Sequence, residues 1–258
     1  MIGVYRPILV VEHVLHYVAL MPRPRVHDLD RVLDVAERLV VEVGPERLTV
    51  RRLSAESGVP NGAIYHAFGS LPALRGRMWL RAADEFLNLQ AELIDEALGA
   101  APAPGVGAAV NAVVAAADAP ARFAERRPTA ARMLMTVRRE QLLGPDLPEE
   151  LADALLGLDR RLVSEVLCRL ASALWGRRDG PSVEVITTCV VDLPTALLRR
   201  ALSQITADGT VQITADVRGR LEAAVRAILD REPPRRGQAD GPPLSAEDAP
   251  TSRPEGQG

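Results

Sequence analysis

The sequence contains no lysine, so all 31 of its basic side chains apart from histidine are arginines. Aromatic residues make up 3% of the 258 positions, which rules out a core rich in rings and requires an aliphatic one. The two cysteines, Cys168 and Cys189, form no CxxC pair, which argues against a disulfide framework or a thiolate metal site. Both are therefore expected to be buried, reduced thiols.

Long apolar runs are also scarce. The most apolar stretch, residues 8–21, is too short to span a bilayer, and no small-residue cleavage site follows it. Within this stretch His13 and His16 have the spacing of metal ligands, but no cysteine or carboxylate cluster completes a site. We therefore expect no membrane partner, no metal and no cofactor, a cytoplasmic protein, and an N-terminal extension over residues 1–25.

What the sequence does contain is helical periodicity almost everywhere. Apolar residues recur at three- and four-residue spacings over residues 28–43 and again over residues 71–98, which predicts one short and one long amphipathic helix. Further helices are expected at residues 106–126, 129–143, 148–175, 182–203 and 215–229, with a kink at Pro194. The repeat ITADGTVQITAD between the last two indicates a loop or a small hairpin. The sequence thus predicts an all-α fold.

The segment between the first and the long helix has the pattern of a helix-turn-helix. Thr49 is suited to be the N-cap of a helix over residues 50–57, and Gly58 supplies the left-handed turn that ends it. Pro60 fits the first position of a third helix. Its slim outward face is of a size that a DNA major groove accepts, and consists of Asn61, Gly62, Ala63, Tyr65 and His66.

The stretch TVRRLSAESGVPNGAIYHAFGSLPALRGRMW, residues 49–79, resembles the N-terminal domain of the TetR family of transcriptional regulators. The resemblance implies that Thr49 and Tyr65 hold DNA phosphates, and that bases are contacted by Asn61, Gly62, Ala63 and His66. Two positions depart from the family pattern, because Ala67 and Leu71 stand where the family often has a histidine and a lysine. The nearby cations that can replace those phosphate contacts are Arg47, Arg51 and Arg52.

The charge distribution is polarised in the same direction. The segment from Arg23 to Arg81 holds ten arginines and seven acidic residues, a local net charge of +3, so the rest of the chain carries −6. A whole-chain net charge of −3 therefore hides a basic N-terminal end.

The helical segment after residue 72 shows no catalytic constellation. The GVGAAV motif at Gly105 lacks the third glycine of a dinucleotide loop and is interpreted as a linker into an alanine-rich helix, and we expect no enzyme. The family resemblance instead implies a ligand-binding and dimerisation domain, in which helices 182–203 and 215–229 form a four-helix bundle with a partner's copies. Candidate residues lining a cavity for a small apolar molecule are Phe86, Met133, Met135, Val137 and Leu155.

Taken together, these patterns predict a helix-turn-helix DNA-binding domain at residues 26–72, a helical ligand-binding and dimerisation domain at 73–230, and a disordered Pro/Gly-rich tail at 231–258. The expected function is a homodimeric repressor that binds double-stranded DNA and is released by a small-molecule effector. The alternative is a helical ligand-binding or scaffolding dimer whose helix-turn-helix has lost DNA affinity, as Ala67 and Leu71 would permit.

Overall fold

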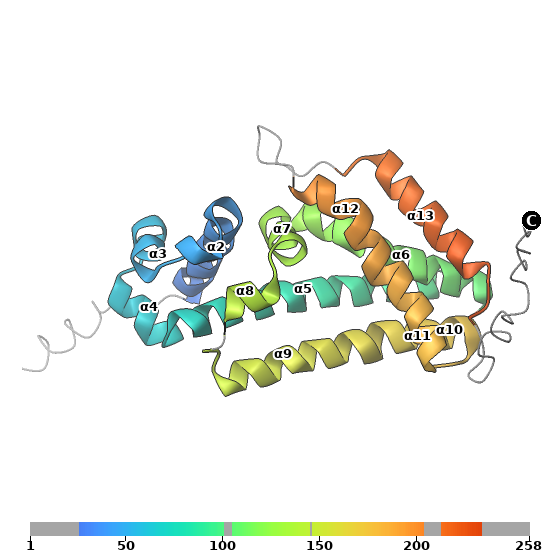
Figure 1. The fold of residues 1–258 in the computed structure, drawn as a ribbon, viewed down its shortest axis with the longest axis horizontal. Helices are drawn as coiled ribbons and strands as arrows, with labels where there is room; N and C mark the ends of the chain where they lie inside the picture. The colour runs from blue at the N-terminus through green and yellow to red at the C-terminus, as the bar shows by residue number, and fades with distance from the viewer. Residues whose placement is uncertain (1–25, 101–104, 145, 204–212, 234–258) are drawn as a thin grey trace, which may run out of the picture.

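A computed structural model describes residues 26–100, 105–144, 146–203 and 213–233, and within these ranges all regular structure is helical (Figure 1). This confirms the all-α fold class. The N-terminal part consists of α2 (Val26–Val43), the 3-10 turn η1 (Pro45–Arg47), α3 (Val50–Ser57) and α4 (Asn61–Phe68), followed by the long helix α5 (Leu71–Gly99).

The remaining helices pack along α5. They are α6 (Val106–Arg126), α7 (Pro128–Thr136), α8 (Arg139–Leu143), α9 (Glu149–Arg161), the π-helical turn η2 (Leu162–Leu167), α10 (Cys168–Trp175), α11 (Gly180–Thr187), the π-helical turn η3 (Thr188–Asp192), α12 (Leu193–Ser203) and α13 (Ala215–Leu229). In Figure 1, α2 to α4 form one end of an elongated molecule, and α10 and α11 lie near the other end.

The N-terminal helices are held together by a small aliphatic core. Leu39 of α2, Leu53 of α3, Ile64 of α4 and Leu74 of α5 are each at most 1% exposed, so all four helices converge on one centre. Leu48, directly before the α3 cap, is equally buried, and it and Leu53 occupy the two positions of a hydrophobic staple. This packing fixes the orientation of α3 and α4 relative to α2 and α5.

A proline inside α6 shows how α5 and α6 are locked together. Pro120 has no N–H, so the carbonyl of Ala116, one turn earlier, loses its helical hydrogen bond. The buried side chain of Gln90 on α5 replaces the missing donor, because its Nε2 donates to the Ala116 oxygen over 3.0 Å. The helical backbone therefore stays paired at a position where proline would leave a buried carbonyl without a partner.

The predicted disturbance at Pro194 takes the form of a π-helical turn. Helix α11 continues through η3 into α12, and η3 ends two residues before Pro194. In a regular α-helix the proline ring would collide with the carbonyl of residue 190, and the wider π turn relieves that collision.

Three expectations need correction or lie outside the described ranges. The helix expected over residues 129–143 is two helices, because α7 ends at Thr136 and α8 begins at Arg139 with extended backbone at Val137 between them. Pro60 is the N-cap of α4 rather than its first residue, since its ψ of 144° is not helical. The extension at 1–25, most of the ITAD repeat and most of the tail fall outside the described residues.

Candidate nucleic-acid interface

The turn between α3 and α4 is built by local backbone chemistry. Thr49 caps α3 by accepting a hydrogen bond from the Arg52 N–H at its side-chain oxygen, over 3.2 Å. At the other end Gly58 has a φ of 74° and donates its N–H to the Ser54 carbonyl over 3.0 Å. A left-handed φ favours glycine, so this residue permits the tight corner. The corner places α4 across the end of the molecule.

Helix α4 buries one side and exposes the other. Ile64 and Phe68 are 1% and 5% exposed and face the core. The five residues predicted to face DNA from this helix are all exposed, and Tyr65 keeps 52% of its surface free; they are Asn61, Gly62, Ala63, Tyr65 and His66. The protein thus presents an aromatic ring on its surface that the core does not use.

The first turn of α4 also presents unpaired backbone donors. No side chain caps this helix, and the first helical bond runs from the Ile64 N–H to the Pro60 carbonyl. The N–H groups of residues 61–63 precede that bond, so they lie at the positive end of the helix dipole. A helix N-terminus of this kind favours phosphate oxygens.

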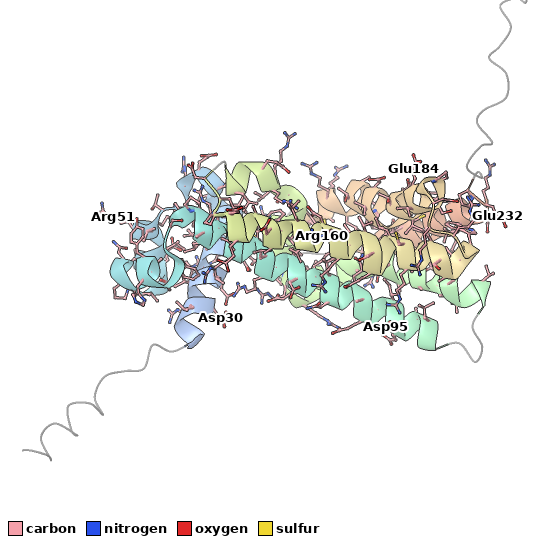
Figure 2. The ribbon with its side chains drawn as sticks, turned by 90° about the horizontal axis from the view of Figure 1, so that it is seen from below. Asp30, Arg51, Asp95, Arg160, Glu184 and Glu232 are labelled. Atoms are coloured by element: carbon pink, nitrogen blue, oxygen red, sulfur yellow. The ribbon has the colours of Figure 1, made fainter. Side chains whose placement is uncertain are left out.

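The three arginines predicted to contact phosphates are not equivalent. Arg47 and Arg51 are exposed, and Figure 2 shows Arg51 at the end of the molecule opposite Glu232. Arg52 is partly buried, and its Nε donates to Glu56 over 3.1 Å. Arg52 therefore enters an ion pair within α3, whereas the other two guanidinium groups point into solvent.

Sequence reasoning did not single out Arg77 of α5. Its guanidinium lies 6.0 Å from the centre of the Phe68 ring at the end of α4, and the residue is exposed. The sequence could have indicated this cation, because Arg77 lies on the polar face of the helix that starts directly after the helix-turn-helix. It adds a cation to the basic end of the molecule.

An ion cluster around the buried Glu37 joins this end to the rest of the protein, and its other members are Arg81, Arg127, Asp34 and Glu85. The Glu37 carboxylate of α2 accepts hydrogen bonds from Arg81 of α5 at 2.5 Å and from Arg127, the N-cap of α7, at 3.2 Å. Asp34 contacts Arg81 at 2.6 Å, and Glu85 contacts Arg127 at 3.3 Å. Burial raises the pKa of Glu37 above its ordinary 4.5, and the two arginines offset only part of that rise. Any movement of α7 relative to α2 strains this cluster.

The five residues predicted to line a ligand cavity lie in or beside the core of the second part. Met133 and Leu155 are 0% and 3% exposed, whereas Met135 and Val137 are partly buried. Phe86 packs edge-to-face against Phe123 of α6, with ring centres 5.6 Å apart. Their role as ligand contacts stays a prediction.

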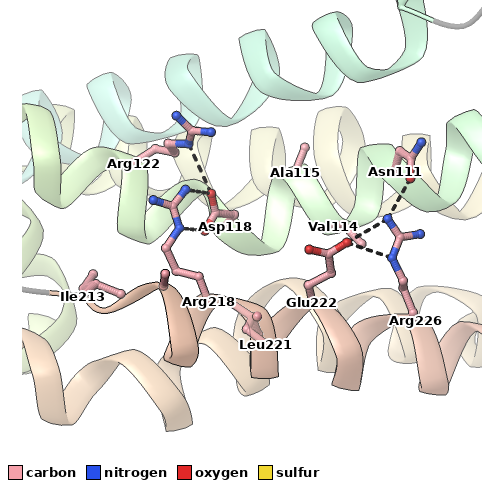
Figure 3. A pocket seen from close by; sticks show the side chains of 12 residues that line it. Asn111, Val114, Ala115, Asp118, Arg122, Ile213, Arg218, Leu221, Glu222 and Arg226 are labelled. Carbon is pink, nitrogen blue, oxygen red and sulfur yellow. Dashed lines mark hydrogen bonds and ion pairs between the residues drawn. The ribbon is translucent and has the colours of Figure 1, made fainter.

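A groove of about 720 Å³ separates α6 from α13 (Figure 3). Its cations are already paired. Arg218 and Arg122 both bond Asp118, and Arg226 bonds Asn111 at 3.0 Å. The bonds of Arg218 and Arg226 hold α13 on α6, and each of the three guanidinium groups already has a partner. Two shallower hollows lie between α5 and α9 and beside α8, and the latter includes Leu155 of the predicted lining.

Among the residues that the structure describes, no three histidine, cysteine, aspartate or glutamate side chains gather where they could hold a metal ion. One helix, Gly180–Leu202, is long and apolar enough to cross a membrane by length and composition, with 33% of its most apolar window buried.

Helix α3 is capped by Thr49 and ends at the left-handed Gly58, and α4 follows with its polar face and free N–H groups outward. This arrangement is that of a helix-turn-helix DNA-binding domain. Residues 32–75 match the sequence profile described as bacterial regulatory proteins, tetR family. The helix-turn-helix lies within this matched segment, so this part of the chain is a DNA-binding domain of the tetR family type.

Solved structures similar to this chain include a TetR-family transcriptional regulator from Streptomyces coelicolor, at 22% identity and a TM-score of 0.42 over 79% of this chain and 98% of that chain. Another is the TetR family transcriptional regulator PfmR from Thermus thermophilus, at 18% identity and a TM-score of 0.44 over 78% of this chain and 98% of that chain. No curated protein matches this chain in sequence at a significant level.

Proposed function

We propose that this protein is a homodimeric repressor that binds operator DNA through residues 26–72 and is released by a small-molecule effector bound within residues 73–230. The observation that carries the proposal is the exposed face of α4. There the Tyr65 ring and three backbone N–H groups are exposed or unpaired and do not contribute to the packing of the fold. DNA phosphates and base edges use such groups. In this account α4 enters the major groove, and Thr49 and the exposed arginines Arg47 and Arg51 hold the backbone.

Dimerisation is proposed through the helix 180–202 and α13. Only 33% of the apolar window of the first is buried in one chain, so apolar surface on this helix is left for a partner. On α13, Ala215, Gly219, Ala223 and Ala227 recur every fourth residue and are exposed, so another helix can approach closely there. Two chains related by a two-fold axis would read half-sites about 34–36 Å apart, or a multiple of that distance.

The effector is proposed to act through α7 and α5. Both helices hold Glu37 of α2 through Arg127 and Arg81, so a ligand that shifts α7 changes the position of the DNA-binding part. A useful release requires the ligand to prefer the non-binding conformer by roughly 1–3 kcal/mol. The protein works where the chromosome is, so we infer a cytoplasmic location.

The test is binding of the full-length protein to duplex DNA from immediately upstream of its own gene, measured by fluorescence anisotropy over a salt series with scrambled DNA as competitor. We expect sequence-selective binding that weakens steeply with salt, and loss of binding in Tyr65→Ala with unchanged melting temperature, because that ring is exposed. The control is Leu156→Ala, which removes an equally exposed apolar side chain from α9.

If neither upstream nor scrambled DNA is bound at any salt concentration, the repressor proposal is wrong. The scaffolding dimer, in which Ala67 and Leu71 have removed two phosphate contacts, would then be the better account. Binding that Tyr65→Ala leaves intact would instead show that α4 is not the helix in the groove.

A further inference from the structure

One arginine in the second part of the molecule has no side-chain partner among the described residues. Arg132 lies in the middle of α7 and is partly buried, and its Nη1 atom is shielded from solvent without a hydrogen bond. In the ranges that the structure describes, no carboxylate, carbonyl or hydroxyl oxygen bonds any nitrogen of this guanidinium group. A guanidinium N–H that is shielded from water and bonds no acceptor is unfavourable, so the position of the Arg132 Nη1 atom needs an explanation.

No other partly buried arginine in the described chain is in this position. Each of the others has a hydrogen bond, an ion pair or both: Arg52, Arg75, Arg81, Arg127, Arg139, Arg161, Arg169, Arg177 and Arg218. Arg75 and Arg81 each leave a buried Nε unpaired, but Nη2 of Arg75 and both terminal nitrogens of Arg81 are bonded. Among the partly buried arginines of the described chain, Arg132 therefore differs in that its guanidinium group bonds no other residue.

The neighbours of Arg132 on the helix suggest what it faces. Residues three or four positions away share its side of α7, and Thr129, Met135 and Thr136 are, like Arg132, partly buried. The residues on the other side, Ala130, Ala131 and Met133, are fully buried. The side of α7 that the fold leaves incompletely covered thus carries a cation, hydroxyl groups and a thioether.

The two threonines on that side differ. The Thr136 hydroxyl donates to the Arg132 carbonyl over 2.7 Å and is used within the helix. The Thr129 hydroxyl has no hydrogen bond in the described part of the chain. Arg132 and Thr129 are thus two unused donors one helical turn apart, and Met135 adds an apolar contact one turn further on.

We propose that this side of α7 binds the carboxylate group of the effector. The planar guanidinium of Arg132 matches a carboxylate with two parallel hydrogen bonds, Thr129 supplies a third donor, and Met135 packs on the apolar part of the ligand. The proposal rests on effector regulation as proposed above and names the chemical class, a small organic carboxylate in place of a purely apolar molecule.

The position on α7 also connects the ligand to DNA binding. Arg127, the N-cap of the same helix, bonds Glu37 of α2. A carboxylate held at Arg132 acts on a short helix of nine residues whose first end is tied to the DNA-binding part.

The experiment measures ligand binding to the full-length protein without DNA, by isothermal titration calorimetry. The probes are benzoate and hexanoate, each compared with its neutral amide, benzamide and hexanamide, at constant ionic strength. The proteins are wild type, Arg132→Met, which keeps an unbranched apolar stem without the charge, and Arg138→Met. Arg138 is an exposed arginine without a partner in the described chain, so it controls for a general loss of positive charge.

We expect wild type and Arg138→Met to bind at least one carboxylate about tenfold more tightly than the matching amide, as hydrogen bonds to charged groups permit. Arg132→Met should lose that preference and melt at the same or a higher temperature, because it no longer buries an N–H donor without an acceptor. If Arg132→Met does not fold, Arg132→Lys takes its place, and a preference reduced by the loss of the planar fork is expected.

Three results would overturn the proposal. In the first, wild type binds carboxylates and amides equally or binds neither. In the second, Arg132→Met keeps the preference for the carboxylate, and in the third, Arg138→Met loses it. Weaker dimerisation of Arg132→Met without any carboxylate preference in wild type would assign the missing counter-charge to a second copy of the chain. Because no DNA is present, none of these results bears on whether the helix-turn-helix binds an operator.

Discussion

Replacing Gly62 by alanine is expected to stabilise the fold and to weaken DNA binding. Gly62 is the second residue of α4 and is exposed. Its φ is not in the left-handed region, unlike that of Gly58 and Gly69, and an added Cβ would meet no atom within 4 Å. Nothing in the described part of the chain therefore requires glycine here, although glycine is a poor helix former.

The magnitudes follow from this geometry. Alanine without strain reduces the freedom of the unfolded chain and adds about 0.4–1 kcal/mol to the free energy of unfolding. For a chain of this size the melting temperature then rises by roughly 1–4 °C. If Gly62 lies against DNA, the added methyl group causes overpacking of about 1 kcal/mol or more in each half-site, so the affinity of the dimer falls by at least about tenfold.

The assay combines thermal unfolding with anisotropy on one DNA duplex, for wild type, Gly62→Ala and Gly107→Ala. Gly107 is a matched control because it is also the second residue of its helix, exposed, and open around its Cβ, but it lies in α6. The control should gain stability and keep its affinity. A Gly62→Ala protein that gains stability and binds DNA as tightly as wild type would refute the placement of α4 in the groove, and one that loses stability would refute the reasoning about the fold.

Three further predictions concern charge and assembly. Arg51→Ala should lower the slope of log affinity against log salt by about one per bound half-site, whereas Arg160→Ala, on the exposed side of α9, should not change it. The pKa of Glu37 is raised in the folded protein, so between pH 4.5 and the folded pKa the folded protein holds a proton that the unfolded chain has lost. The free energy of unfolding therefore falls as pH rises through this window, and Glu37→Gln should flatten the dependence in urea titrations. Ala223→Glu, on the exposed small-residue side of α13, should convert dimers to monomers in sedimentation velocity with little change in helix content; intact dimers would exclude this face.

Helix positions were predictable because apolar periodicity and capping residues act locally. The structure has α3 at the predicted residues, and it also has the Thr49 cap and the Gly58 corner. The break at Val137 was missed because the apolar pattern continues across it, and only tertiary packing decides that α7 ends at Thr136. Pro194 predicted a disturbance of its helix. That the disturbance is a π turn depends on packing against neighbouring helices, which a linear pattern does not specify.

The candidate interface was predictable to the extent that it is a continuous segment. Exposure of Asn61, Tyr65 and His66 follows from the helical face opposite Ile64. The ion pair of Arg52 with Glu56, at positions four apart, could have been expected from spacing but was not. The cluster around Glu37 and the isolation of Arg132 could not have been foreseen, because they depend on residues far apart in sequence or on the absence of any partner in space.

The central claim is that α4 reads DNA in a two-fold symmetric complex. Its most direct test is selection of binding sites by the full-length protein from a pool of random-sequence duplex DNA, followed by sequencing of the bound fraction. The account predicts enrichment of an inverted repeat whose half-sites are spaced by whole helical turns, and loss of that enrichment in Tyr65→Ala. A bound fraction with the same sequence composition as the starting pool would contradict it.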